Sequence, residues 1–159
     1  MTAPRTPDLL TAVDRLIGLP FPADDQRPAW RGLWGGPTYL MTVLHESRDF
    51  WEDRSEDVVE AAQRELDAAC DALAAALTAR WGSPRPLDLR PDPGFGEGGP
   101  DADDPVPEPF ESLRRVASHV QVWGIAASHR SLVLTIGQAD AEFPLQLLAA
   151  VVTEPVPAS

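Results

Sequence analysis

Residues 55–81, SEDVVEAAQRELDAACDALAAALTARW, carry the longest regular pattern in this chain of 159 residues. Ser55 is suited to cap a helix, and the acidic residues that follow it favour the positive end of a helix dipole. Gly82 and Pro84 end the pattern. The stretch therefore predicts one helix, about 40 Å long, that spans a domain of this size. Its apolar residues recur at helical spacing and form one stripe: Val59, Ala62, Leu66, Ala69, Cys70, Leu73, Leu77 and Trp81.

Segments with the sequence pattern of β-strands precede and follow this helix in the chain. Residues 38–46, TYLMTVLHE, place apolar side chains on both faces, which is typical of an inner strand. Residues 86–90 suit a short strand, and residues 116–125, 131–137 and 143–152 predict an antiparallel meander. Because Pro144 has no N–H to donate, we expect the start of the last strand to lie at a sheet edge.

The remaining segments complete the predicted fold. Residues 7–17 suit a short helix with Thr6 as its N-cap, and residues 19–37 read as a loop rich in proline and glycine. Residues 91–109, PDPGFGEGGPDADDPVPEP, predict a flexible acidic loop. We therefore expect a single α+β domain over residues 1–159. Its long central helix packs on a mixed, mainly antiparallel sheet of about four to five strands. The first helix and the 19–37 loop are expected to cover the opposite sheet face.

The formal net charge of −12 constrains the partners. All 13 basic residues are arginine, a bias typical of GC-rich bacterial genomes. Such acidity disfavours nucleic acid and anionic membranes, whereas it would attract a basic protein. The single cysteine excludes an internal disulfide, which suits a reducing compartment. The first residues lack the pattern of a signal peptide. We expect a cytoplasmic protein that binds no nucleic acid and no membrane.

No catalytic, metal or cofactor motif stands out. His45 and Glu46, with Asp49 nearby, form the first candidate for acid–base chemistry, but neighbours on a strand point to opposite faces. A zinc site needs three or four converging ligands, and the three scattered histidines, which include His119 and His129, and the one helix cysteine would converge only by tertiary accident. Cys70 falls within the apolar helical stripe, where a cysteine usually packs as a small hydrophobe. The sequence predicts no cofactor and more readily a binding protein than an enzyme.

Aromatic residues on either side of the 38–46 strand are the candidate binding residues. Tryptophan and arginine are enriched in binding hot spots, although packing in the core is the alternative role. The leading hypothesis is a small acidic protein-binding module, either an inhibitor of the immunity type or an assembly adaptor. The alternative is a small enzyme or small-ligand-binding protein with a pocket near the 19–37 loop, in which His45 titrates. A DNA mimic is a third hypothesis. The candidate partner-binding residues are Trp30, Arg31, Trp34, Phe50 and Trp51.

Overall fold

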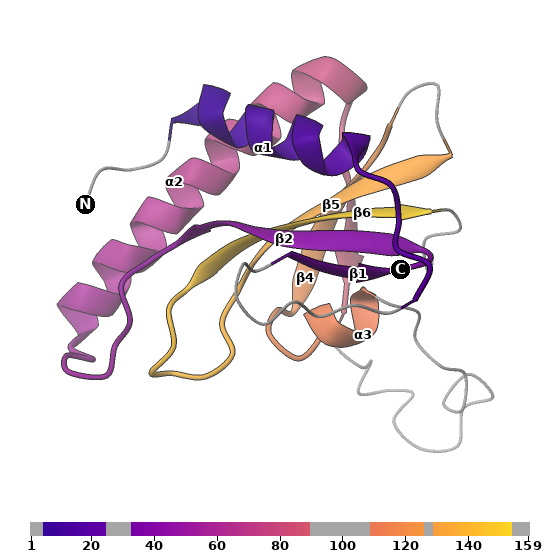
Figure 1. Cartoon of the computed structure of the whole chain (residues 1–159). Helices are drawn as coiled ribbons and strands as arrows, with labels where there is room; N and C mark the ends of the chain where they lie inside the picture. The colour runs from indigo at the N-terminus through magenta and orange to yellow at the C-terminus, as the bar shows by residue number, and fades with distance from the viewer. Residues whose placement is uncertain (1–4, 25–32, 90–108, 126–128, 154–159) are drawn as a thin grey trace, which may run out of the picture.

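The computed structural model describes residues 5–24, 33–89, 109–125 and 129–153, which form an α+β fold (Figure 1). The expected fold class is therefore confirmed. Trp30, Arg31 and the acidic loop up to residue 108 lie outside the described residues. The elements are α1 (Thr6–Gly18), β1 (Leu33–Gly36), β2 (Tyr39–Glu46), α2 (Glu56–Trp81), β3 (Arg85–Asp88), α3 (Phe110–Leu113), β4 (His119–Gly124), β5 (Arg130–Gly137) and β6 (Gln146–Thr153).

One sheet of six strands, in the order β1-β2-β6-β5-β4-β3, runs through the described residues. Every neighbouring pair in it is antiparallel. The expected count of four to five strands was therefore too low, and the expected mixed character was wrong. The predicted meander is confirmed as β4, β5 and β6, which are consecutive in the sheet.

The additional strand is β1, within the segment expected to be a loop. It pairs with β2 through a hairpin in which Gly36 lies opposite Tyr39. A Cβ atom on Gly35 would lie 2.5 Å from the carbonyl oxygen of Tyr39, so this close approach requires glycine. The glycines that resemble a loop signal in the sequence are thus what allow this strand to pair.

The last strand, β6, is an inner strand and not an edge strand. It pairs with β2 on one side and with β5 on the other. Pro144 precedes the first residue of β6, Gln146, so its missing N–H removes no hydrogen bond from the ladder. The expected edge position was wrong because the strand begins after the proline.

Both longer helices cover the same face of the sheet, as Figure 1 shows. The buried residues of α1 belong to one apolar cluster with those of α2 and with inward-facing residues of β2, β4, β5 and β6. An ion pair of 2.7 Å between Arg80 and Asp14 also joins the two helices. The expectation that α1 covers the opposite face was wrong, because its apolar stripe packs beside α2. The α2 stripe itself is confirmed, with Ala62, Leu66, Ala69, Leu73 and Leu77 buried.

The opposite face of the sheet carries a second buried apolar cluster. The short helix α3 contributes Phe110 and Leu113 to it. Tyr39 and Met41 of β2 lie in this second cluster, whereas Leu40 lies in the first. The prediction that β2 is covered on both faces is therefore confirmed.

Candidate functional site

Two loops are joined at one end of the sheet, where β2 leads into α2 and β5 turns into β6. The backbone N–H of Ser47 donates to the carbonyl of Leu145 at 2.8 Å. The N–H of Leu145 donates in return to the Ser47 hydroxyl oxygen at 2.9 Å. The N–H of Phe50 donates to the carbonyl of Glu142 at 2.9 Å. These bonds extend the pairing of β2 with β6 beyond the strands and fix the two loops to each other.

Neighbouring aromatic residues in the first loop have opposite environments. Phe50 is 0% exposed and belongs to the main core cluster, so it anchors the loop. Trp51 is 61% exposed. Its ring meets that of Phe143 edge to face, with centroids 5.5 Å apart and planes at 88°. Edge-to-face packing of this kind favours a defined ring geometry. We call Trp51 and Phe143 the aromatic patch.

Charged side chains occupy the same two loops as the aromatic patch. An ion pair of 2.8 Å joins Arg54 to Glu142 and connects the loops a further time. The backbone N–H of Ser55 donates to Asp53 at 2.9 Å, and this hydrogen bond is the main reason that the pKa of Asp53 is lowered. Carboxylates outnumber guanidinium groups here, so the patch has an acidic rim. The rim consists of Asp49, Glu52, Asp53, Asp140 and Glu142, with Arg48 and Arg54.

The candidate binding residues are not brought together as one surface. Trp34 is half-buried on β1 opposite Met41 and packs against the second cluster. Five residues of β2, about 17 Å of strand, separate Met41 from the end that leads to Trp51. Phe50 lies in the core. Of the five residues, only Trp51 is exposed within the part of the chain that the structure describes, and sequence reasoning missed its partner Phe143.

The carboxylate that His45 contacts lies on α2 and not on the strand that carries His45. Its Nε2 atom lies 3.1 Å from Oε1 of Glu65 on α2, and both side chains are mostly covered. An open hollow of about 680 Å³ lies beside Glu65. The described residues that line this hollow include no aromatic ring: Arg48, Asp49, Asp57, Val58, Ala61, Ala62 and Glu65. The pair therefore connects β2 to α2, with a carboxylate-rich surface next to it.

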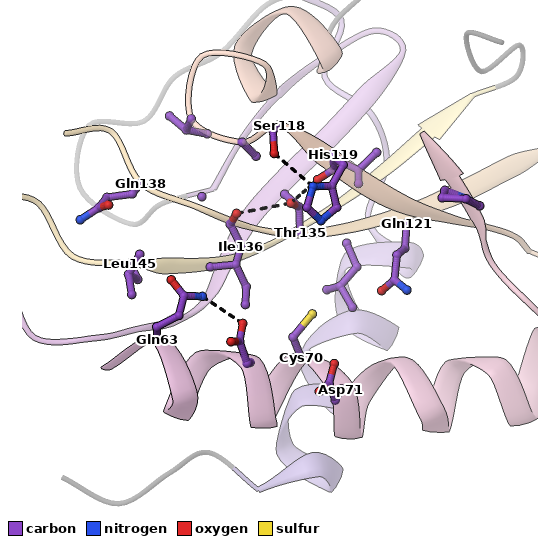
Figure 2. A pocket seen from close by; sticks show the side chains of 17 residues that line it. Gln63, Cys70, Asp71, Ser118, His119, Gln121, Thr135, Ile136, Gln138 and Leu145 are labelled. Carbon is purple, nitrogen blue, oxygen red and sulfur yellow. Dashed lines mark hydrogen bonds between the residues drawn. The ribbon is translucent and has the colours of Figure 1, made fainter. Parts of the chain in front are cut away.

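A separate cavity of about 500 Å³ lies between α2 and one end of β4 and β5 (Figure 2). Pairing of these strands ends at Gln121 and Leu134, although β5 continues to Gly137. Beyond that point, the Thr135 hydroxyl donates to the carbonyl of His119 at 2.7 Å. At this end of the two strands, a side-chain hydrogen bond thus takes the place of the regular ladder.

Cys70 lines this cavity from α2, and its sulfur points toward the strands in Figure 2. Burial, with smaller contributions from Asp71 and Asp67, raises the pKa of the Cys70 thiol to about 11. The thiol is therefore protonated at neutral pH and is a poor nucleophile. His119 lies across the cavity, with Nδ1 3.1 Å from the Ser118 hydroxyl oxygen.

The remaining sequence candidates do not converge. His129 is exposed at the start of β5, away from the His45–Glu65 pair on β2 and α2. Across residues 5–24, 33–89, 109–125 and 129–153, no three side chains of His, Cys, Asp or Glu are grouped so that they could hold a metal ion. None of the helices in these ranges has the length and apolar character needed to cross a membrane.

Comparison of the chain with known protein families, with curated proteins and with solved structures gave no match. Inferences about function therefore rest on the residues and their geometry.

Proposed function

We propose that this chain is a small acidic protein-binding module, of the inhibitor or assembly-adaptor type, and that the aromatic patch is the centre of its contact surface. The observation that carries the proposal is the exposed, ring-to-ring contact of Trp51 with Phe143. Large apolar side chains in water are costly, and a contact surface is the usual reason for exposing two together. Among the described residues, the only other large hydrophobic side chain that is similarly exposed is Leu19.

The loops beneath the patch support this proposal because they are held in place before any partner arrives. Three hydrogen bonds of Ser47 and Phe50 join the two loops, and the Phe50 ring is buried in the core. A surface that is ordered in advance loses less conformational entropy when it binds. The aromatic rings can therefore act as rigid anchors.

The charge around the patch supports a basic partner. The two loops carry five carboxylates and two arginines, and the whole chain carries a net charge of −12. Such a rim attracts lysine and arginine side chains, and an exposed tryptophan face can bind one through a cation–π contact. The cytoplasm is the proposed location of this interaction, because a single cysteine, which can form no internal disulfide, suits a reducing compartment.

A pull-down from a lysate of the source organism, at low and at moderate salt, tests the proposal. The bait is the wild-type chain, the double variant Trp51→Ala/Phe143→Ala, or the control Leu19→Ala, which removes an exposed apolar side chain from a different surface. We expect one basic protein with wild type and with Leu19→Ala, less of it at moderate salt, and none with the double variant. Equal capture by all three baits, or no capture at either salt, contradicts the proposal.

The alternative, a small-ligand-binding protein or enzyme that uses His45, is favoured by one observation. A carboxylate 3.1 Å from a histidine can orient the ring for proton transfer. The arrangement also has a structural role, since it ties β2 to α2. In the alternative, Glu65→Gln abolishes ligand binding or turnover while the fold remains intact. Capture of the basic partner by a Glu65→Gln bait at wild-type levels favours the binding module instead.

A further inference from the structure

Carboxylates and amides form part of the wall of the cavity between α2 and the end of β4 and β5. On the helix, Asp67 and Asp71 lie one turn apart and Gln63 donates to Asp67 at 2.9 Å. Opposite them, Figure 2 shows Gln121 pointing toward α2. No arginine is among the described residues that line the cavity. The polar lining also includes the His119 imidazole and the hydroxyls of Ser118 and Thr135, so the carboxylates are the charged groups on the helix wall, and they disfavour an anion beside α2.

Apolar side chains form part of the lining. Leu134 and Ile136 contribute from β5 and Leu145 from the segment before β6. Ile136 lies between the strand and α2 in Figure 2. A volume of about 500 Å³ is within the range of small-molecule sites. The space suits a ligand that has an apolar body and a polar end.

The charge of the two carboxylates reaches into the cavity. Burial is the main cause of the raised pKa of the Cys70 thiol, whose sulfur points into the same space, and Asp71 and Asp67 add to it. The two carboxylates, unlike burial, disfavour a negative charge at this point and favour a positive one.

We propose that this cavity binds a small organic cation, a primary ammonium group on a compact apolar body. The ammonium group binds between the carboxylates of Asp67 and Asp71, and the apolar body packs against Leu134 and Ile136. An ammonium group has three N–H donors. The two carboxylates and the amide oxygen of Gln121 can accept hydrogen bonds from them. This site does not include the aromatic patch, so the ligand proposal can be tested separately from the proposal of a protein partner.

Calorimetric titration at low ionic strength tests the site, with phenethylammonium chloride as the probe and 2-phenylethanol as its neutral counterpart. We expect saturable binding of the ammonium compound at one site per chain, and at least tenfold weaker binding of the alcohol. Asp67→Asn and Asp71→Asn should each weaken binding of the ammonium compound by about two- to fivefold, as expected for ion pairs with exposed carboxylates.

The control variant is Glu60→Gln, which removes the same charge from the same helix outside the cavity lining. It should leave the affinity unchanged. A loss in Glu60→Gln equal to that in Asp67→Asn means that only the overall charge attracts the probe, which overturns the proposal. Absence of saturable binding overturns it also.

Cys70→Met provides a test that does not depend on charge. A methionine fits a helix and extends further into the cavity than the half-buried cysteine does. We expect it to reduce binding of the ammonium compound more than either asparagine variant does. Unchanged affinity in Cys70→Met places the probe outside the cavity and overturns the proposal.

Discussion

Phe50 and Trp51 are adjacent in the chain, yet alanine substitutions of the two should have very different effects on stability. Phe50 is 0% exposed, and replacing a buried phenylalanine by alanine costs about 3–5 kcal/mol through lost burial and the cavity left behind. Trp51 is 61% exposed and loses mainly its edge contact with Phe143. That contact contributes about 0.5–1.5 kcal/mol. The difference between the variants should therefore be about 2–4 kcal/mol.

Urea denaturation followed by far-UV circular dichroism measures this difference. If the slope of the free energy of unfolding against urea is unchanged, a shift in midpoint reports stability directly. For a chain of this size each kcal/mol corresponds to about 2–4 °C in melting temperature. Phe50→Ala should therefore lower the melting temperature by about 6–20 °C, and Trp51→Ala by no more than about 6 °C.

Equal losses of stability in the two variants, or a larger loss in Trp51→Ala, would refute this prediction. Either result would mean that the Trp51 ring is packed into the body of the protein in solution. The aromatic patch would then be part of the core, and it could not act as a contact surface.

Three further predictions follow from single contacts. Gly35→Ala should cost about 1–3 kcal/mol in urea denaturation, because its Cβ would meet the Tyr39 carbonyl at 2.5 Å; a neutral effect would argue against the close β1–β2 approach. Ser47→Ala should cost about 1–3 kcal/mol, because the buried N–H of Leu145 loses its acceptor, and amide hydrogen exchange should show faster exchange at that N–H. The rate of Cys70 alkylation by iodoacetamide should continue to rise until the pH passes about 11, because only the thiolate reacts; a plateau near pH 9, its ordinary value, would contradict the burial of the thiol.

The long helix and the meander could be predicted because their patterns are local. The α2 stripe repeats over seven turns, and its cap and stop residues agree with it. β5 and β6 are short, nearly continuous apolar runs, and turn residues separate them from each other and from β4. Strand order and the side on which α1 packs depend on contacts between distant segments. The sequence pattern of α1 is equally compatible with either face of the sheet.

The candidate site was only partly predictable. Phe50 and Trp51 lie in a loop without periodicity, so nothing in the sequence distinguishes the buried ring from the exposed one. Phe143 lies about 90 residues further on and meets Trp51 only because β2 and β6 pair. The sequence likewise does not indicate which carboxylate contacts His45. Glu65, which does so, is on α2, whereas the nearest carboxylate in the sequence is Glu46. The cavity lies where β4–β5 pairing ends early, and alternation of residue types does not reveal that end.

Site-specific photo-cross-linking most directly tests the claim that the aromatic patch is a contact surface. A photoreactive phenylalanine analogue replaces Phe143 in one protein and Leu19 in another, and both positions are exposed. After irradiation in a lysate of the source organism, the account predicts that position 143 is cross-linked to one basic protein and that position 19 is not. Cross-linking of that protein at position 19 alone, or of the same mixture at both positions, would contradict it.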